Sequence, residues 1–304
     1  MRISSLTAVL LGLCLLSCSA EKRTEPLWQE VSGDKALAHV QALVDLGPRP
    51  PGSEALEKSR IYIEKQLRDI GWETTRQVFT DETPRGKMEF VNLIARFRGK
   101  NSGVQAEPSF LLCSHYDTKI FDGGQFVGAN DGGSSTGLVI ELARVLAQRP
   151  ALAAKIQLVF FDGEEAVEEF TDRDGLYGSR YFANELTKAK AASQFKGGIL
   201  LDMIGDKALG ITLPIDSPPD MAQNVFAAAE ALNCRNKFTY FDHGNVYDDH
   251  TPLNSAGIPT IDLIDFDYPA WHTVGDTMDK ISADSLGVVG RVVIYYLTQF
   301  QPSK

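Results

Sequence analysis

Cysteine is scarce in this chain, with four residues among 304. Cys14 and Cys18 lie in an apolar N-terminal stretch, which leaves Cys113 and Cys234 for the remainder of the chain. Two cysteines so far apart in sequence exclude a disulfide-rich scaffold and a zinc site built from several thiolates. We expect two inert buried thiols, although their separation in sequence leaves a bridge between them open. We also expect a fold stabilised by its core and any metal to be held by nitrogen and oxygen atoms.

Basic residues are few relative to acidic ones, with 30 Lys and Arg against 40 Asp and Glu and a net charge of −10. Surplus negative charge disfavours nucleic acid and anionic membrane surfaces as partners. The chain also lacks internal repeats and low-complexity tracts, and its 43% hydrophobic and 23% charged residues are typical of a folded domain. The composition therefore favours a globular enzyme that does not bind nucleic acid.

Long apolar runs are absent except near the N-terminus, where residues 6–16 are mostly apolar. This run is too short to span a bilayer and has the length of a signal-peptide core. Leu15-Leu16-Ser17-Cys18 resembles a bacterial lipobox, so we predict a signal peptide over residues 1–17, a lipid on Cys18 and a tether over residues 18–31. The mature protein would be an exported lipoprotein without a transmembrane helix, periplasmic or anchored at the outer membrane or cell surface. An ordinary secretory signal and a buried helix remain alternatives.

Short apolar runs alternate with helical patterns along the rest of the chain. Helices are predicted at residues 36–46, 53–70 and 136–147. This alternation predicts an α/β fold with one domain over residues 32–304: a three-layer sandwich with a mixed, mostly parallel twisted sheet and helices on both faces. The first two strands could form an antiparallel hairpin at the edge of the sheet. Strands are predicted at residues 72–79, 89–97, 109–114, 156–161, 198–202, 237–241 and 259–264.

The fourth predicted strand is followed by Asp162-Gly163-Glu164-Glu165, which places two adjacent carboxylates directly after an apolar run. Two like charges at the end of a buried strand cost electrostatic and desolvation free energy. A cation at this position would explain the arrangement. Adjacent side chains in an extended segment diverge, so one glutamate could bind a metal while the other faces the substrate as a general acid and base. Two solvated loop glutamates are the alternative that this segment alone leaves open.

Four further polar side chains stand where predicted strands end or a helix begins. His115, Asp202 and His272 come at or after the ends of the third, fifth and seventh predicted strands, and Asp131 lies in a glycine-rich loop before the third predicted helix. Since open α/β folds bind ligands at the carboxyl edge of their sheet, we expect these residues to meet there. A set of histidines and carboxylates without cysteine suits a catalytic zinc site.

Taken together, these clusters resemble the glutaminyl cyclases and, more broadly, the zinc aminopeptidases that share their fold. The resemblance covers the chain from about residue 33 onward. Leu-Tyr-Gly-Ser-Arg, Asp-Asp-His and the Trp-His pair favour the cyclase branch. The motifs are Ser114-His115-Tyr116-Asp117, Asn130-Asp131-Gly132, Phe160-Phe161-Asp162-Gly163-Glu164-Glu165-Ala166, Leu176-Tyr177-Gly178-Ser179-Arg180, Leu200-Leu201-Asp202-Met203-Ile204-Gly205, Asp248-Asp249-His250 and Trp271-His272-Thr273.

The resemblance implies a metal site and a reaction. Asp131, Glu165 and His272 would hold one zinc ion and leave a fourth position for the substrate. Glu164 would carry a proton from the α-amine of an N-terminal glutamine to the departing ammonia, as the amine attacks the γ-carboxamide. The implied protein is a glutaminyl-peptide cyclotransferase that acts on peptides or proteins with an N-terminal Gln, and we expect a monomer.

The resemblance also implies a carboxylate network beside Glu164. Asp202 and Asp248 would support Glu164 and share a proton, which raises one apparent pKa. Asp262 stands where vertebrate-type cyclases carry a histidine, and we assign it to the substrate-binding region. A buried strand carboxyl satisfied by the backbone is the alternative for Asp262.

Aromatic residues would form the walls of the substrate pocket. Trp271 would lie beside the zinc ligand that follows it, with Phe266 or Tyr268 as a further wall. Phe170 falls where vertebrate-type cyclases place a tryptophan, which keeps an aromatic face but loses the indole N–H. The acidic and aromatic stretch over residues 262–268 could instead be a dimer contact, and we favour the pocket because the stretch leads directly to Trp271.

Two other functions are compatible with parts of the pattern. In a two-zinc aminopeptidase, His115 and Asp202 would complete a second zinc site, Asp131 would bridge the metals, and Glu164 would activate water. The cyclase branch keeps His115 and Asp202 while binding a single zinc, so their presence does not decide between one zinc and two. A catalytically silent binding module is disfavoured by the intact pair Glu164 and Glu165, since buried charge is costly without a use.

Overall fold

The computed structural model describes residues 25–99 and 106–300. The predicted signal peptide, Cys18 and the first part of the predicted tether lie outside the described residues. Leu27–Glu30 forms a 3-10 helix whose Leu27 is buried in the core, so a tether would have to end before this helix. Across the described ranges, no helix combines the length and apolarity needed to cross a bilayer.

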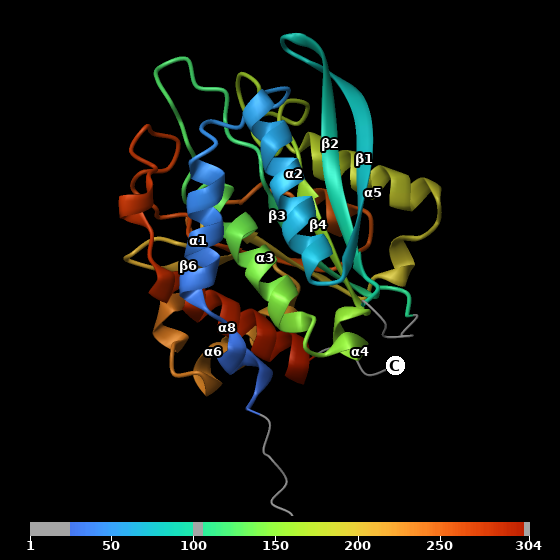
Figure 1. The fold of residues 1–304 in the computed structure, drawn as a ribbon, viewed down its shortest axis with the longest axis vertical. Coiled ribbons are helices and arrows are strands. Elements are labelled where there is room, and N and C mark those ends of the chain that lie inside the picture. Colours follow the sequence, from blue (N-terminus) through green and yellow to red (C-terminus); the bar gives the residue numbers. More distant parts are fainter. Residues whose placement is uncertain (1–24, 100–105, 301–304) are drawn as a thin grey trace, which may run out of the picture.

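The described chain forms one eight-stranded sheet flanked by helices (Figure 1). The strands are β1 (Trp72–Thr83), β2 (Gly86–Phe97), β3 (Phe110–His115), β4 (Ile156–Phe161), β5 (Gly198–Asp202), β6 (Ile211–Pro214), β7 (Phe238–Phe241) and β8 (Thr260–Ile264). The helices are α1 (Gly33–Val44), α2 (Glu54–Asp69), α3 (Gly133–Leu146), α4 (Pro150–Ala153), α5 (Tyr177–Lys188), α6 (Pro219–Ala231), α7 (His250–Ser255) and α8 (Ala283–Gln299).

The strand order is β1-β2-β4-β3-β5-β8-β6-β7. Strands β4, β3, β5 and β8 run parallel at the centre, and β1 and β2 form an antiparallel hairpin at one edge. The predicted mixed, mostly parallel sheet with an edge hairpin is therefore confirmed. Strand β6 was not predicted, because it has only four residues, ends in Pro214, and pairs with β8 only at Thr212.

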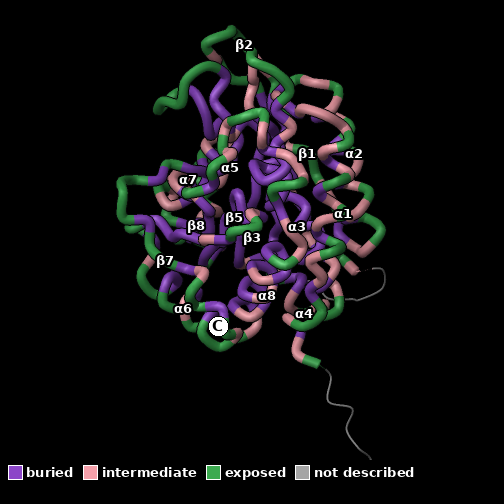
Figure 2. The backbone as a smooth tube through the Cα atoms, turned by 90° about the vertical axis from the view of Figure 1, so that its left-hand side faces the viewer, coloured by how far each residue is buried: buried purple, intermediate pink, exposed green. Residues whose placement is uncertain are grey.

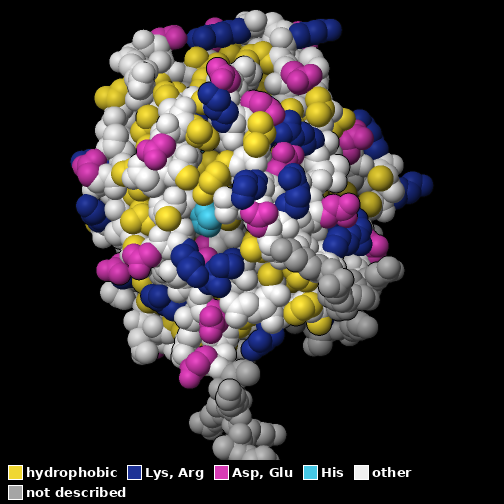
Figure 3. Space-filling model, viewed as in Figure 1, with side chains coloured by type: hydrophobic (Ala, Val, Ile, Leu, Met, Phe, Trp, Pro, Cys, Tyr) yellow, Lys and Arg dark blue, Asp and Glu magenta, His cyan; other side chains and the backbone are white. Residues whose placement is uncertain are grey.

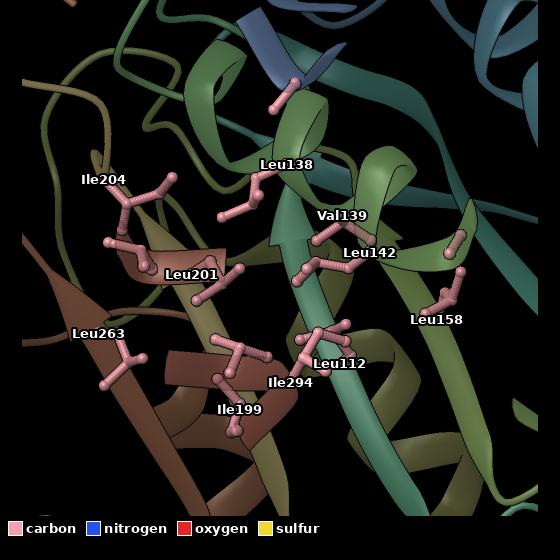
Figure 4. Close-up of a cluster of buried hydrophobic side chains, with 14 of the residues drawn as sticks. Leu112, Leu138, Val139, Leu142, Leu158, Ile199, Leu201, Ile204, Leu263 and Ile294 are labelled. Atoms are coloured by element: carbon pink, nitrogen blue, oxygen red, sulfur yellow. The ribbon is translucent and has the colours of Figure 1, made fainter. Parts of the chain in front are cut away.

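Alternating side chains of the central strands build a core on each face of the sheet. On β3, Leu112 packs in the larger core beneath α1, α3 and α8, whereas Leu111 and Cys113 pack on the opposite face with residues of α5 and α7. In Figure 4, Leu112 and neighbouring strand residues point toward Leu138 and Leu142 of α3. Figure 2 shows α1 and α3 on one side of the sheet and α5 and α7 on the other. This confirms the predicted three layers.

Both remaining cysteines are buried and free, as expected. No cross-link therefore involves Cys113 or Cys234, and the two cores hold the fold together. On the face that carries α1 and α2, Lys and Arg are interspersed with Asp and Glu (Figure 3). That face therefore presents no extended basic surface.

Helix α3 begins at Gly133, three residues earlier than predicted, which brings its N-terminus directly behind Asp131. The turn into the helix passes through Gly132, whose φ of 72° favours glycine. A Cβ at Gly132 would lie 2.8 Å from the carbonyl oxygen of Asp117 and 2.9 Å from the ring of His115. The glycine therefore allows the loop to approach the end of β3 closely.

Candidate metal centre and active site

Parallel strands deliver ionisable side chains to one edge of the sheet. Strand β3 ends at His115, β5 ends at Asp202, and the loop after β4 carries Glu164 and Glu165. Because the carboxyl ends of parallel strands point the same way, these side chains gather at a single edge. Asp131 and His272 reach the same place from loops, so the six residues predicted for the metal site or its support lie together.

Asp131, Glu165 and His272 form one compact group, with one ligand atom of each within 4.8 Å of the others. His272 Nε2 lies 3.2 Å from Glu165 Oε2 and 3.5 Å from Asp131 Oδ2. Asp131 Oδ2 and Glu165 Oε1 are buried and have no hydrogen-bond donor among the described residues. Buried carboxylate oxygens without donors fit a bound cation. Two carboxylates and one imidazole, open to a cavity, suit a catalytic zinc ion.

The electrostatics of this group favour binding of a cation. Burial raises the pKa of Asp131 to about 7, and the charge of Glu165 adds to the effect. Burial alone would also raise the pKa of Glu165, but its hydrogen bond to His272 and the charges of His272 and Lys119 lower that pKa overall. Lys119 Nζ lies 3.7 Å from Glu165 Oε2. Glu165 is therefore held ionised, ready to act as a ligand.

His272 is placed by a strained backbone. Its φ of 51° lies in the left-handed region, which costs a non-glycine residue about 1–3 kcal/mol. The imidazole stacks on Trp271 with ring centroids 4.4 Å apart and meets the edge of Phe126. These two rings fix the orientation of the imidazole toward Asp131 and Glu165.

His115 stands at the centre of a second group with Asp131 and Asp202. Its Nε2 lies 3.1 Å from Asp202 Oδ1 and 3.2 Å from Asp131 Oδ1, and its Nδ1 lies 3.5 Å from Asp117 Oδ1. Burial works against protonation, yet the carboxylates raise the pKa of His115 well above its ordinary value. These contacts have the lengths of hydrogen bonds and weak ion pairs, and Nε2 can donate its single N–H to Asp202 or share it with Asp131.

Glu164 lies between the metal group and the cavity. Its Oε2 is 4.0 Å from His115 Nδ1, and its backbone N–H donates to Asp117 Oδ1 over 3.3 Å. Burial raises the pKa of Glu164 well above its ordinary value, and the nearby Glu165 and Asp248 raise it further against the opposing effect of His115. A carboxyl group with a raised pKa beside a ligand cavity can both accept and return a proton.

A buried acid cluster, defined as Asp248, Asp249, His250 and Asp262, lies beside Glu164. Burial raises the pKa of Asp248 and Asp262 well above the ordinary value; the charge of Asp202 adds to both shifts, and Asp248 adds to that of Asp262. Burial also lowers the pKa of His250 to about 4, although its Nδ1 lies 3.5 Å from Asp262 Oδ2. Burial therefore disfavours the charged form of each residue in the cluster, and its carboxyl groups are close enough to share protons.

The carboxylates of the predicted support network occupy different depths. Asp202 and Asp248 line the cavity next to Glu164. Asp262 does not, because the chain of β8 directs it to the opposite face from Leu263, where it is fully buried behind Asp248. The assignment of Asp262 to the substrate pocket is therefore not supported by its position, although Asp262 interacts electrostatically with the cavity residues Asp248 and Asp202.

A cavity of about 420 Å³ opens above the metal group. Phe170, Phe266 and Trp271 form its aromatic walls, as predicted, and Tyr247 adds a fourth aromatic residue that sequence reasoning missed. Tyr268 is not a wall: it is 4% exposed, and its hydroxyl donates to Asp276 Oδ1 over 2.8 Å. The stretch over residues 262–268 therefore contributes Ile264 and Phe266 to the cavity lining, and Tyr268 supports the site from behind.

Asp276 holds the loop that carries Asp131. Its two carboxylate oxygens accept the backbone N–H groups of Asn130 and Asp131 over 2.8 and 3.0 Å. The buried Arg49 holds the other end of the loop by donating to the carbonyl oxygens of Val127 and Gly128. Neither residue carries a local motif, since the sequence shows Arg49 only as part of a Gly- and Pro-rich breaker. Long-range contacts of this kind have no local sequence signal.

Asp117 and Asp174 organise the two ends of the loop after β4. Asp117 accepts the backbone N–H groups of Glu164 and Glu165, each over 3.3 Å. Asp174 accepts three further N–H groups, from Val167, Glu168 and Glu169, at distances between 2.7 and 3.0 Å. The position of Asp117 next to His115 in its motif could have indicated its role, whereas the loop contacts of Asp174 have no comparable signal.

Comparison with known proteins places this arrangement in a family. Residues 92–297 match the model of peptidase family M28. A crystal structure of glutaminyl cyclase from an Acidobacteriales bacterium has 33% sequence identity and a TM-score of 0.81, covering 92% of this chain and 97% of that one. The glutaminyl-peptide cyclotransferase of Bos taurus is 30% identical, and the match spans 84% of this chain and 79% of that protein.

A crystal structure of a Zn-dependent exopeptidase from Parabacteroides distasonis is also similar, with 28% identity and a TM-score of 0.77 over 88% of this chain and 98% of that one. Fold similarity thus extends to proteins of both activities considered from the sequence. The resemblance inferred from the motifs is confirmed, and the chain belongs to peptidase family M28, in the part of that family that contains the glutaminyl-peptide cyclotransferases.

Proposed function

We propose that this protein is a zinc-dependent glutaminyl-peptide cyclotransferase, which converts the N-terminal Gln of peptides or proteins to pyroglutamate and releases ammonia. One observation carries the proposal: Glu164, with its raised pKa, lies beside the metal group Asp131, Glu165 and His272 in one aromatic cavity. The similarity to the cyclotransferases described above supports the same reaction.

In the proposed reaction, the α-amine of the substrate attacks the carbon of its own γ-carboxamide. A bond forms between the α-nitrogen and this carbon, and the bond from the carbon to the amide nitrogen breaks. Glu164 accepts a proton from the attacking amine and returns it to the leaving nitrogen, which departs as ammonia. A zinc ion bound by Asp131, Glu165 and His272 supplies Lewis acidity toward the carboxamide oxygen.

The surroundings of Glu164 suit this double role. Asp248 and Asp202 lie on the same cavity wall, and both add negative charge that favours a protonated carboxyl in the cluster. A protonated Glu164 can donate to the leaving nitrogen, while the ionised form can accept from the amine. The raised pKa makes the protonated form easier to populate than it is for an exposed glutamate.

The cavity also explains how a neutral side chain is held. Aromatic rings from Phe170, Phe266 and Trp271 supply flat apolar walls for the methylene groups of a glutamine side chain. They exclude water from the carboxamide, which disfavours hydrolysis to glutamate. The acidic floor attracts the protonated α-amine of the incoming peptide.

A two-zinc aminopeptidase is the second candidate, and one observation favours it: His115, Asp131 and Asp202 form a second group of potential ligands that shares Asp131 with the first. We propose one zinc, as the resemblance to the glutaminyl cyclases implies, with His115 and Asp202 supporting the site rather than binding a metal. The ratio of zinc to protein, measured by mass spectrometry after metal loading, tests the number. A value near two would favour the aminopeptidase.

The decisive experiment offers a Gln-initiated and a Leu-initiated peptide to the zinc-loaded protein and measures the masses of the products. We expect the first peptide to lose ammonia and the second to remain intact. Release of free N-terminal amino acids from either peptide would contradict the proposal and identify an aminopeptidase.

We further propose that the protein is exported and anchored through a lipid on Cys18, a proposal that rests on the sequence Leu15-Leu16-Ser17-Cys18. Replacing Cys18 by Ala should move the protein from the membrane fraction to the soluble fraction of the expressing bacterium. An unchanged distribution would contradict lipidation. The proposed monomeric state is tested by light scattering on the soluble domain.

A further inference from the structure

A second groove lies next to the active-site cavity. It has a volume of about 730 Å³, larger than the cavity itself, and runs between α5 and α7. Its lining is mostly uncharged. On the α5 side it is formed by Ala183, Asn184 and Thr187, and on the α7 side by Thr251, Pro252, Ser255 and Ala256. No residue of the metal group or of the buried acid cluster lines it.

The groove and the cavity share two wall residues, Phe170 and Tyr247. Both are unusually exposed for aromatic side chains, at 43% and 60%. Exposed aromatic rings that border two adjoining depressions are typical of a binding surface. The two depressions therefore form one continuous surface, with the aromatic pair at the junction.

The wall at the junction is built with fixed geometry. A Cβ at Gly175, whose φ is 112°, would lie 2.8 Å from the ring of Phe170, so the ring rests directly on the glycine. Arg180 donates to the carbonyl oxygens of Asp172 and Arg173 over 2.8 and 3.2 Å, which ties α5 to the loop that carries Phe170. The junction is thus held in place without any bound molecule.

The proposed reaction requires the chain of the substrate to leave the cavity. The reacting α-amine and side chain belong to the first residue, whereas an extended peptide advances by about 3.3–3.6 Å per residue. From about the third residue onward, a peptide therefore lies outside a cavity that holds one side chain. Asp172 and Arg180 are the charged residues in the groove lining, and their opposite charges impose no net charge requirement on these peptide residues. The exposed Asn184 and Ser255 offer polar groups to a peptide backbone.

We propose that this groove binds the residues of the substrate that follow the first two, so that the protein prefers longer peptides and protein N-termini to glutaminyl dipeptides. This inference rests on the proposed function, because it takes the first residue to sit in the cavity. The occupant is the extended peptide chain continuing from the cyclised residue.

The test compares a Gln-initiated dipeptide amide with an octapeptide that begins with the same two residues, in wild-type protein and in Ser255→Trp and Asn184→Trp. Both substitutions fill the groove from exposed positions. Lys188→Trp is the matched control, because Lys188 is exposed on the same helix as Asn184 but does not line the groove.

We expect wild-type protein to show a kcat/KM about tenfold higher for the octapeptide, equivalent to about 1.4 kcal/mol of binding free energy. The groove variants should remove most of this difference by raising KM for the octapeptide, and should leave the values for the dipeptide within about twofold. Lys188→Trp should behave as wild type. Equal values for the two substrates in wild-type protein, or an unchanged ratio in both groove variants, would overturn the proposal.

Binding measured by fluorescence anisotropy with a C-terminally labelled octapeptide separates this inference from the proposed reaction. Suppose that no Gln peptide is cyclised, but that the octapeptide has a lower Kd than the dipeptide amide shows in competition with it. If Ser255→Trp removes this difference in affinity, the groove assignment holds and the proposed reaction is wrong. If cyclisation occurs with equal affinities for both peptides, the reaction holds and the groove assignment is wrong.

Discussion

Two groups of ionisable side chains, about equally rich in carboxylates, lie close together at the same edge of the sheet. The metal group of Asp131, Glu165 and His272 opens to the cavity, and His272 is 30% exposed. The group of Asp248, His250 and Asp262 also consists of two carboxylates and one histidine, with its ligand atoms within the same 4.8 Å, but Asp262 is completely buried and His250 nearly so. Composition alone does not distinguish them.

Their surroundings make them chemically different. Glu165 has two cationic neighbours, His272 and Lys119, and its pKa is lowered. Asp262 lies against Asp248 and 3.5 Å from His250, whose pKa of about 4 disfavours its cationic form, and burial raises the pKa of Asp262 well above the ordinary value. The metal group, which opens to the cavity, is therefore suited to hold a cation, while the group of Asp248, His250 and Asp262 is suited to hold protons next to Glu164.

The largest effect on the metal group, with none expected on the group of Asp248, His250 and Asp262, should come from Glu165→Ala. Removing this ligand should abolish zinc binding at the cavity and with it all turnover, because the remaining Asp131 and His272 form an incomplete site. Zinc content after gel filtration and the rate of ammonia release measure the two effects.

Glu168→Ala is the matched control for this variant. Glu168 lies on the same loop and lines the same cavity, but its side chain is 54% exposed. It should keep both the zinc and the activity. Full zinc content in Glu165→Ala would contradict the assignment of this residue as a ligand.

The next largest effect should come from Glu164→Gln, which keeps the shape of the side chain and removes its ability to accept a proton. We expect kcat to fall by about 10²–10⁴, the usual contribution of a general acid and base, with zinc content unchanged. Activity near that of wild type would exclude Glu164 as the proton carrier. Loss of zinc instead would indicate that Glu164 belongs to the metal group.

Much of this arrangement is readable in the sequence, because it follows from local patterns. The apolar runs of β3, β4, β5 and β8 give the sheet, and the polar residues that end them necessarily meet at one edge. His272 could be placed only through its motif, since the 3.2 Å contact with Glu165 joins segments more than a hundred residues apart.

The sequence does not show which polar and aromatic residues face the cavity and which are buried behind it. Asp248 and Asp262 are both plausible pocket residues in a linear reading, yet only Asp248 lines the cavity. Tyr268 was predicted as a wall and instead supports Asp276, which in turn holds Asp131. Which of several neighbouring polar residues faces the cavity depends on the tertiary packing of loops, for which alternation along a strand gives no rule.

The smallest and most specific effect should come from Asp262→Asn, measured without metal. The folded-state pKa of Asp262 is raised, so the folded chain keeps a proton that the unfolded chain loses at about pH 3.9. The free energy of unfolding therefore falls as pH rises, until the folded-state pKa is passed. His250 has the opposite sign, but its folded-state pKa of about 4 confines its effect to pH values below about 6.5.

Between pH 6.5 and 8.5 in EDTA, the Tm of wild-type protein should therefore fall. Asp262→Asn should reduce that fall, by about 2–4 °C for each kcal/mol of pH-dependent unfolding free energy that the substitution eliminates. Asp265→Asn is the control: Asp265 follows the same strand, but its pKa of about 6 lies below the window, so the slope should not change. A slope in Asp262→Asn equal to that of wild type would show that Asp262 is already ionised in the folded chain. The buried group would then need a cation as much as the metal group does, and the contrast between the two would disappear.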